Sequence, residues 1–153
     1  GMEVIWWGSA ARRAALVAAG ETVPESRTAF FGGADVISLH LRLVPQTRGI
    51  VTAKDLAQMR ADAILVNTSR AGLIEVGALL PALTKGRPAM AALDVFDVEP
   101  VLDPNDPLLT HPRVIATPHI GFVTRDEFDL QFGEIYDQIN AYTSGAPINL
   151  VAG

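Results

Sequence analysis

The chain has 153 residues, 49% of them hydrophobic and 19% charged, with a formal net charge of −5. This composition excludes a disordered chain, and the negative charge argues against nucleic acid as a partner because phosphate groups would be repelled. The absence of cysteine excludes disulfides and thiolate chemistry, and no apolar run approaches the roughly 18 residues that a membrane span needs. With no charged-then-apolar leader at its start, we expect a cytoplasmic globular protein, and we assign no metal site.

Short apolar runs alternate with helix signals along the first third of the chain. Residues 3–7 (EVIWW) predict a strand, and the alanine-rich residues 10–19 predict a helix that ends at Gly20. Residues 26–31 predict a short helix with a serine as its N-cap, and the β-branched run of residues 35–41 predicts a second strand.

The same alternation continues to the end of the chain. Thr52 is expected to cap a short helix, and residues 74–85 predict a longer one with a kink at Pro81 and an end at Gly86. The last predicted helix, over residues 124–143, has a single apolar stripe formed by Phe128, Phe132, Ile135 and Ile139. Three further strands are predicted, over residues 63–67, 88–94 and 114–117.

Strands that are apolar on both sides and separated by helices predict an α/β fold: a Rossmann-like, doubly wound parallel sheet with helices on both faces. In such sheets, ligands bind beyond the carboxyl ends of the strands. Polar side chains follow three of the predicted strand ends. The three that could carry chemistry are Arg70, Glu99 and His119.

These three side chains suit one reaction when they act together, although each alone is typical of a solvated surface or loop. An imidazole exchanges a proton with a substrate hydroxyl near neutral pH, and a neighbouring carboxylate fixes its tautomer and raises its pKa. An arginine can bind a substrate carboxylate through two parallel hydrogen bonds. A proton donor, an orienting carboxylate and an anion-binding arginine are the groups required to reduce a 2-keto acid to a 2-hydroxy acid.

Three ordered blocks of sequence supply a precedent for this spacing. The blocks "LVNTSRAGLIEVGALLPAL", "ALDVFDVEP" and "TPHIG" together resemble the signatures of the D-isomer-specific 2-hydroxyacid dehydrogenase family, and the resemblance extends from the first residue to "GAPINLV". It implies that Arg70 binds the substrate carboxylate and carbonyl. It also implies that His119 is the general acid in reduction and the base in oxidation, with Glu99 as its partner. Asp94 would hold the nicotinamide carboxamide.

The same resemblance implies a dinucleotide cofactor, NAD or NADP. Apart from Asp94, the residues that would line it are Leu41, Thr47, Thr68, Ser69, Arg70, His119, Gly121 and Phe122. At the adenosine end, the acidic residue usual in this fold is replaced by Gly8 and Ser9, followed by Arg12 and Arg13.

Two arginines in the first turn of a helix oppose its dipole unless an anion lies nearby. A 2′-phosphate would be such an anion, which favours NADP and makes Ser9 and Arg12 candidate cofactor ligands. The alternative is that both arginines face solvent, so the choice between NAD and NADP stays open.

A Gly-x-Gly-x-x-Gly turn for the cofactor pyrophosphate does not occur in the sequence. We interpret residues 1–153 as a partial dinucleotide-binding domain, the C-terminal portion of a two-domain dehydrogenase. In the usual strand order 3-2-1-4-5-6 the missing first strand is central, so two inner strand edges lose their partner. We therefore expect a swap of elements with a second copy, a local rearrangement or a longer parent protein, and we expect a homodimer.

Two classes of function compete. The first is an NAD(P)-dependent enzyme that interconverts a 2-keto acid and a D-2-hydroxy acid. The second is a non-catalytic module: a truncated remnant, or a dimerisation and binding domain like those of the family's transcriptional corepressors. The trio Arg70, Glu99 and His119 favours the enzyme, and the missing glycine turn favours a chain that is inactive alone. The three ordered blocks exclude an unrelated flavodoxin-like domain.

Overall fold

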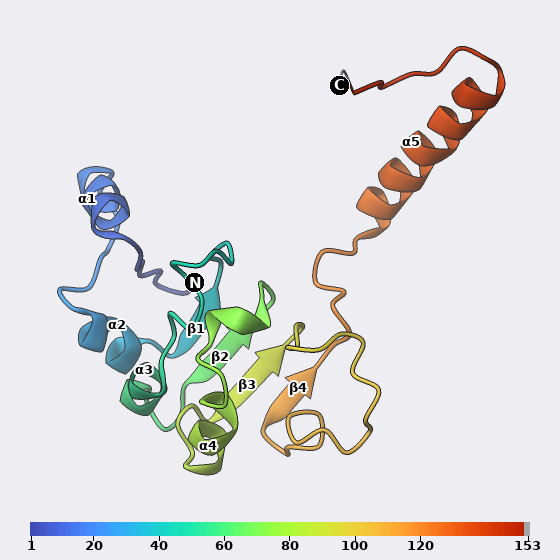
Figure 1. The fold of residues 1–153 in the computed structure, drawn as a ribbon. Helices are drawn as coiled ribbons and strands as arrows, with labels where there is room; N and C mark the ends of the chain where they lie inside the picture. The colour runs from blue at the N-terminus through green and yellow to red at the C-terminus, as the bar shows by residue number, and fades with distance from the viewer. Residues whose placement is uncertain (152–153) are drawn as a thin grey trace. The chain divides into compact units, whose positions relative to one another are not determined.

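The computed structural model describes residues 1–151, and the chain divides into two compact units, Gly1–His119 and Ile120–Gly153. The first unit contains a parallel sheet and short helices, and the second contains one long helix (Figure 1). In chain order the elements are α1 (Ala10–Ala18), α2 (Arg27–Gly33), β1 (Val36–Leu39), α3 (Ala53–Gln58), β2 (Ile64–Asn67), the 3-10 turn η1 (Ala71–Leu73), α4 (Leu79–Thr84), β3 (Met90–Leu93), β4 (Val114–Ala116) and α5 (Arg125–Thr143).

The four strands form one parallel sheet in the order β1-β2-β3-β4. Because the chain advances across this sheet in one direction, right-handed crossovers place the connecting helices on one face. Accordingly, α2 packs against α3 and α3 packs against α4, and the three helices form one layer (Figure 1).

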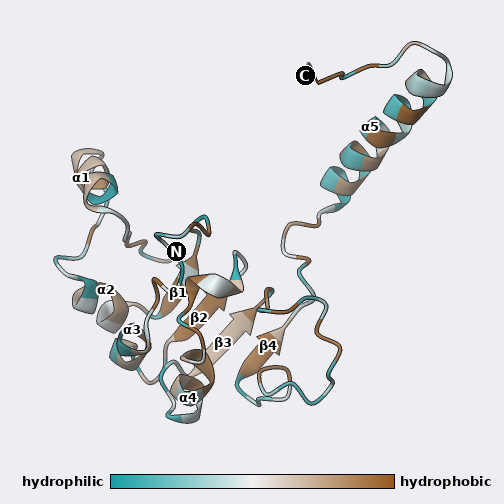
Figure 2. Ribbon diagram, in the orientation of Figure 1, coloured by the Kyte–Doolittle hydropathy of each residue, from teal (hydrophilic) through white to brown (hydrophobic). Residues whose placement is uncertain are grey.

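The face of the sheet toward these helices is the hydrophobic core of the first unit. Ile37, Leu65 and Leu93 on the strands are at most 3% exposed, and they belong to one cluster with Leu56 and Leu83 from the helices. Figure 2 shows the apolar character of the strands. Burial of one such side chain stabilises a fold by about 1.5–3 kcal/mol, so this one-sided core is the main source of the unit's stability.

The opposite face of the sheet is uncovered, which corrects the expectation of helices on both faces. Val36, Ile64 and Ile115 on this face are 47%, 36% and 59% exposed. The reason is the single direction of the strand order, because right-handed crossovers reach the other face only where the chain advances in the opposite sense. The α/β, Rossmann-like parallel sheet is confirmed, with one layer of helices.

The strand predicted over residues 3–7 is wrong, since this segment has no regular structure. Trp6 donates its backbone N–H to the carbonyl of Thr22 (3.0 Å) and its indole N–H to the carboxylate of Glu21 (2.9 Å). A strand needs a neighbour, and within residues 1–151 β1 pairs only with β2. The apolar pattern of residues 3–7 is typical of a strand, but no strand within residues 1–151 pairs with this segment.

The helix predicted over residues 74–85 begins later, at Leu79. Ile74 instead forms an isolated parallel bridge with Val51, and Gly77 turns the chain with a positive φ of 74°. Pro81 is the third residue of α4, where its nitrogen would have no intrahelical acceptor, so the predicted kink is also wrong.

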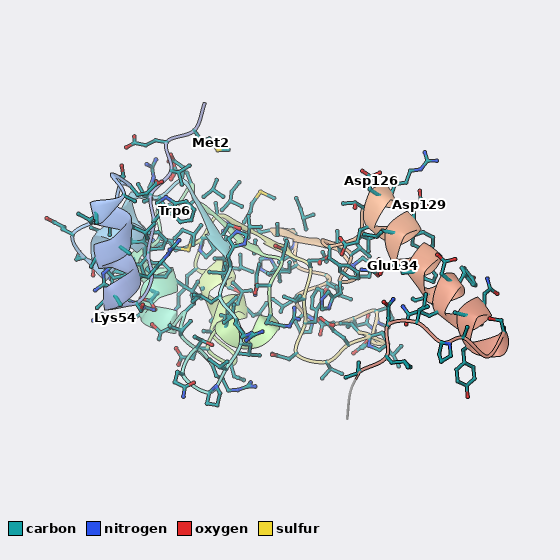
Figure 3. The ribbon with its side chains drawn as sticks, turned by 90° about the horizontal axis from the view of Figure 1, so that it is seen from above. Met2, Trp6, Lys54, Asp126, Asp129 and Glu134 are labelled. Atoms are coloured by element: carbon teal, nitrogen blue, oxygen red, sulfur yellow. The ribbon has the colours of Figure 1, made fainter. Side chains whose placement is uncertain are left out.

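The second unit contains α5, close to the predicted range of residues 124–143, and its N-cap is Thr124, whose hydroxyl accepts the backbone N–H of Glu127 (3.1 Å). The predicted apolar stripe is on this helix, and its members Phe128, Phe132, Ile135 and Ile139 are 41–53% exposed. Acidic side chains, among them those of Asp126, Asp129 and Glu134, also project from α5 (Figure 3). Within residues 1–151, no helix combines the length and the apolarity needed to cross a membrane.

Serine or threonine caps begin three helices of the first unit. Ser9 caps α1 and Ser26 caps α2, each through its hydroxyl, as the sequence predicts for Ser26. Thr52 caps α3 in a reciprocal arrangement, because Asp55 accepts the backbone N–H of Thr52 (2.7 Å). The same carboxylate receives two hydrogen bonds from Arg27, at 2.6 and 2.8 Å, which join α2 to α3.

The Asp55 carboxylate is therefore a link on which two helices depend. Replacement of Asp55 by alanine should lower the free energy of unfolding by about 1–3 kcal/mol, because the backbone N–H of Thr52 loses its acceptor and Arg27 loses its ion-pair partner. Urea denaturation near neutral pH measures this. Asp62→Ala is the matched control: Asp62 makes an equivalent two-bond pair with Arg60, at 2.8 and 2.7 Å, but its side chain is 69% exposed against 8% for Asp55. An equal loss in both variants would contradict the interpretation.

The same link predicts a pH dependence. Burial raises the pKa of Asp55, but the hydrogen bonds from Arg27 and Thr52 outweigh it and hold the pKa below its ordinary value. The folded-state pKa is thus below the unfolded one, so the contribution is present above about pH 4 and is lost as the pH falls through the folded-state value. The stability difference between wild type and Asp55→Asn should shrink over that acid range. A difference that grows in acid would contradict the assignment.

Candidate active site

The segments after the four strands emerge at one edge of the sheet. The register pairs Leu39 with Asn67, Asn67 with Leu93, and Leu93 with Ala116. Because the strands are parallel, this row is their common carboxyl end, where ligands bind in open α/β sheets. Most of the side chains singled out from the sequence follow this row.

A histidine–carboxylate pair lies beyond β4. His119 Nδ1 is 2.6 Å from Glu99 Oε2, and both side chains are about one-third exposed, at 36% and 35%. The other oxygen of Glu99 accepts the backbone N–H of Phe96 (2.8 Å), which fixes the carboxylate in its loop. His119 has a positive φ of 57°, and its backbone N–H donates to the carbonyl of Thr117 (3.0 Å). The ring nitrogen turned away from the carboxylate is Nε2.

The electrostatics of this pair favour an ionised carboxylate. The hydrogen bond with His119 is the largest cause that holds the pKa of Glu99 below its ordinary value, and the N–H of Phe96 is the next. The positive charge of Arg70 acts in the same direction, against the effect of burial. Arg70, Glu99 and His119 therefore share one electrostatic environment.

Asn67 holds the loop that carries Arg70. This asparagine ends β2 and is 1% exposed. Its amide N–H donates to the carbonyl of Arg70 (2.9 Å), and its amide oxygen accepts the N–H of Ser69 (3.1 Å). The hydroxyl of Ser69 donates to the carbonyl of Leu41 (2.9 Å), which ties this loop to the segment after β1. The role of Asn67 was not predicted; the only signal for it was a polar residue at the end of an apolar run.

Asp94 is a buried carboxylate at the same edge. It follows β3, is 2% exposed, and donates its backbone N–H to the carbonyl of Asn67 (3.0 Å). The hydroxyl of Thr117, which follows β4, donates to Asp94 Oδ1. Sequence reasoning missed Thr117, because nothing in its local pattern shows that it meets a residue 23 positions away.

The structure places the other predicted cofactor residues in several different loops. Leu41 is 38% exposed and Thr68 is exposed, both in loops after strands. Thr47 uses its hydroxyl to build a turn, accepting the N–H of Val44 (2.9 Å) and donating to the carbonyl of Arg42 (2.6 Å). Ser9 is occupied as the cap of α1. Gly121 and Phe122 belong to the second unit.

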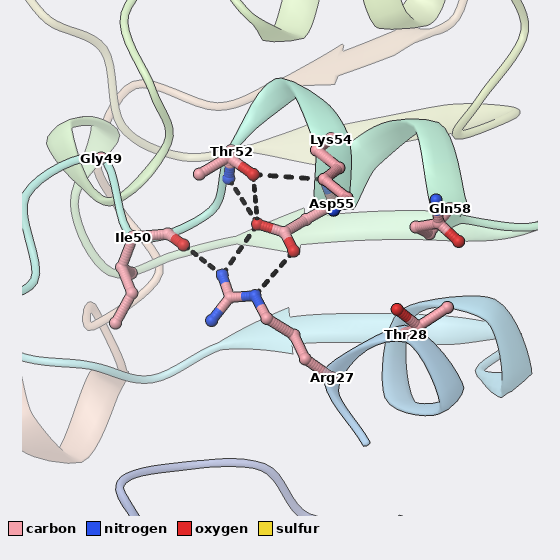
Figure 4. Close-up of a pocket in the computed structure, with 8 residues that line it drawn as sticks. All are labelled: Arg27, Thr28, Gly49, Ile50, Thr52, Lys54, Asp55 and Gln58. Atoms are coloured by element: carbon pink, nitrogen blue, oxygen red, sulfur yellow. Dashed lines mark hydrogen bonds and ion pairs between the residues drawn. The ribbon is translucent and has the colours of Figure 1, made fainter.

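A pocket of about 490 Å³ lies away from this chemistry, between the first turns of α2 and α3 (Figure 4). Lys54 lines it, and its other two charged residues, Arg27 and Asp55, bind each other, while Arg27 also donates to the carbonyl of Ile50. Because these groups satisfy one another, we interpret the pocket as a surface depression over a structural ion pair, and not as the active site.

Comparison with known proteins identifies the family and its fold. The family model described as "D-isomer specific 2-hydroxyacid dehydrogenase, NAD binding domain" matches residues 1–121. The chain belongs to this family. The match confirms the resemblance seen in the three sequence blocks and makes a nicotinamide dinucleotide the cofactor of the fold.

Individual members of the family are similar over most of this chain. A D-3-phosphoglycerate dehydrogenase of Bacillus subtilis is 37% identical over 115 residues, which are 75% of this chain and 22% of that protein. The crystal structure of an oxidoreductase from Ralstonia solanacearum has a TM-score of 0.87 at 42% identity, covering 99% of this chain and 44% of that one. A D-isomer specific 2-hydroxyacid dehydrogenase from Xanthobacter autotrophicus, in complex with NADPH, has a TM-score of 0.62 at 31% identity, over 87% of this chain and 55% of that one. The chain thus spans less than half the length of the first two relatives.

The Glu99–His119 contact can be tested by titration. His119→Asn should raise the pKa of Glu99 toward its ordinary value, because the largest of the interactions that lower it is removed. Carbon-detected NMR of the Glu99 carboxyl across the acid range measures this shift. His111→Asn is the control, since His111 bonds the N–H of Arg113 (3.2 Å) and not the carboxylate. A Glu99 titration unchanged by His119→Asn would show that the pair does not form in solution.

Proposed function

We propose that this chain carries the catalytic residues of a dehydrogenase that interconverts a 2-keto acid and a D-2-hydroxy acid with NAD or NADP. The observation that supports this most directly is the 2.6 Å contact between His119 and Glu99 at the carboxyl edge of the sheet, within the electrostatic range of Arg70. From the resemblance to the D-isomer-specific 2-hydroxyacid dehydrogenase family, we propose that the protein works as a homodimer in the cytoplasm.

The chemistry of the residues at this edge fits the nicotinamide end of the cofactor. Asp94 presents a carboxylate, an acceptor for the amide hydrogens of a carboxamide, at the end of β3, and Thr117 holds that carboxylate in place. When bound, the reduced cofactor supplies a hydride to C2 of the keto acid. The chain's own residues must then bind the acid and provide a proton.

Arg70 would bind the substrate carboxylate, because a guanidinium matches the two oxygens of a carboxylate. His119 would donate a proton from Nε2 to the carbonyl oxygen of the substrate as that oxygen becomes a hydroxyl, and it would take this proton back in oxidation. Glu99 holds the ring by Nδ1, which sets Nε2 toward the substrate and stabilises the imidazolium. Arg70 follows β2, Glu99 follows β3 and His119 follows β4, so the three side chains come from successive loops at one edge of the sheet.

For the adenosine end, Arg12 is the arginine that we assign to a 2′-phosphate if the cofactor is NADP. Arg13 is already engaged, because its guanidinium lies 4.3 Å from the centre of the Trp7 ring and donates to the carbonyl of Gly8 (2.6 Å). Arg12 is exposed and close to Ser9, at the N-terminus of α1.

Titration of the chain with NADH and NADPH, followed by nicotinamide fluorescence, separates the two cofactors. Arg12→Ala should weaken the binding of NADPH and leave the binding of NADH unchanged, because only NADPH carries the 2′-phosphate.

Turnover should depend on His119. We suggest a chimaera in which this chain replaces the matched 44% of the Ralstonia solanacearum protein, assayed for NAD(P)H oxidation with a panel of 2-keto acids. His119→Asn should lower kcat by about 10²–10⁴-fold, the usual contribution of a general acid. His111→Asn is the matched control and should keep the rate. A folded chimaera that binds cofactor but oxidises it equally with and without His119 would favour the non-catalytic module.

A further inference from the structure

A line of hydrogen bonds crosses the carboxyl edge of the sheet. The side-chain N–H of Asn67 donates to the carbonyl of Arg70 (2.9 Å), and the backbone carbonyl of Asn67 accepts the N–H of Asp94 (3.0 Å). Asp94 Oδ1 accepts the hydroxyl of Thr117, whose carbonyl accepts the backbone N–H of His119 (3.0 Å). We call these five residues the edge network. It connects the arginine assigned to the substrate, the carboxylate assigned to the nicotinamide and the histidine assigned to proton transfer.

Asn67 and Thr117 are the members of the edge network that have no assigned part in the reaction. Each uses its side chain on one neighbour and its backbone carbonyl on the next, so each joins two other members. Asp94 lies between them and bonds to both. An amide and a hydroxyl are neutral groups that donate and accept hydrogen bonds, so their contribution is to hold charged groups in place.

The backbone pairing of the sheet brings Thr117 to Asp94. Leu93 is paired with Ala116, and the N–H of Thr117 extends this ladder by donating to the carbonyl of Leu93 (2.9 Å). The N–H of Asp94 extends the ladder between β2 and β3 in the same way, through its bond to Asn67. The bond between the hydroxyl and the carboxylate therefore joins two ladders at the point where both end.

Burial makes the bond between Thr117 and Asp94 difficult to replace. Asp94 is 2% exposed and Asn67 is 1% exposed, so both lie where water does not readily substitute for a lost partner. Thr117 itself is exposed, so a change of its side chain leaves the core closed. Without the hydroxyl, the carboxylate turns toward another donor, and this motion disturbs its backbone bond to Asn67.

The turn of His119 depends on the backbone of Thr117. His119 has a φ of 57°, a left-handed conformation that a residue with a Cβ adopts only when its surroundings hold it. The bond from its N–H to the carbonyl of Thr117 helps to hold it, and this bond is effective only if Thr117 is itself fixed. Because Thr117 carries both bonds, its position sets Asp94 and His119 together.

We propose that Thr117 is a positioning residue: through the edge network it couples the carboxylate of Asp94 to the placement of His119 on one side and of Arg70 on the other. Its hydroxyl fixes Asp94, which holds the carbonyl of Asn67 and with it the loop of Arg70. Its carbonyl fixes the turn of His119. The effect on turnover rests on the proposed dehydrogenase function, whereas the coupling between the ends of the network is a property of the folded chain.

Hydrogen exchange of the 153-residue chain, followed by NMR, tests the coupling without any need for activity. In Thr117→Val, which keeps the shape of the side chain and removes the hydroxyl, two amides report on the two ends of the network. They are the N–H of Ser69, which donates to Asn67 Oδ1 (3.1 Å), and the N–H of His119. Both should exchange at least about tenfold faster than in wild type, and Thr117→Ser, which keeps the hydroxyl, should retain the wild-type rates.

Thr84→Val is the matched control. Thr84 is also exposed, and its hydroxyl donates to the carbonyl of Leu80 (2.9 Å) within α4, outside the edge network. This variant should leave the exchange of Ser69 and His119 unchanged. If Thr117→Val does not fold by circular dichroism, Thr117→Ala takes its place with the same expected result.

The chimaera described above adds a kinetic readout that a purely local role of Thr117 would not change. Thr117→Val should lower kcat/KM for the 2-keto acid by at least about tenfold, because His119 and Arg70 lose their set positions. In an Arg70→Lys background the same change should cost less, because the placement of that arginine no longer matters. Equal costs in both backgrounds would show that Thr117 and Arg70 act independently.

The exchange rates decide the proposal at its other points. Unchanged rates at Ser69 and His119 in Thr117→Val would overturn it, as would faster exchange at only one of the two amides. A loss that Thr117→Ser or Thr84→Val shares would also overturn it, since the hydroxyl on Asp94 would not be the cause. A chimaera that has no activity from the outset contradicts the proposed dehydrogenase function instead, and the exchange rates then decide the coupling alone.

Discussion

Because β1 to β4 run parallel and end in one row, the segments that leave Leu39, Asn67, Leu93 and Ala116 emerge at a single edge of the sheet. Everything chemical in the first unit depends on this alignment. Arg70, Asp94 and His119 lie far apart in the sequence, yet each is only one to three positions beyond a strand of the row. A shift of one residue in the pairing of β3 would turn its buried side chains to the uncovered face of the sheet and carry Asp94 away from Thr117.

Two polar residues keep the loops of this edge in a defined shape. Asn67 uses both ends of its amide on the loop of Arg70, and Thr117 holds the carboxylate of Asp94. Neither residue needs to touch a substrate to matter, since a carboxylate or guanidinium is useful only when its position is set in advance. Their hydrogen bonds are largely shielded from water, because Asn67 and Asp94 are almost fully buried. The edge is thus built before any ligand arrives.

Local interactions were predictable from the sequence, and distant ones were not. Caps such as Ser26 and Thr52 act within three residues, so their pattern suffices, and the apolar runs of β1 to β4 identify strands by themselves. The late start of α4 depends on a bridge between Ile74 and Val51, which no local pattern contains. The pairing of Glu99 with His119 was expected from a resemblance to a family and not from periodicity. Residues 3–7 show the converse: their apolar pattern is typical of a strand, but they form none because no neighbouring strand pairs with them.

His119 has a left-handed backbone conformation, with a φ of 57°. Among side chains with a Cβ, this region is tolerated best by asparagine, aspartate and histidine, and it costs about 1–3 kcal/mol for a non-glycine residue. Two independent constraints therefore limit which residue types suit position 119. The turn tolerates few residue types, and among these only histidine has a pKa suited to the proposed proton transfer near neutral pH. Substitutions that survive at position 119 should cluster among those that satisfy the turn, so a folded variant can lose its chemistry without any sign of strain.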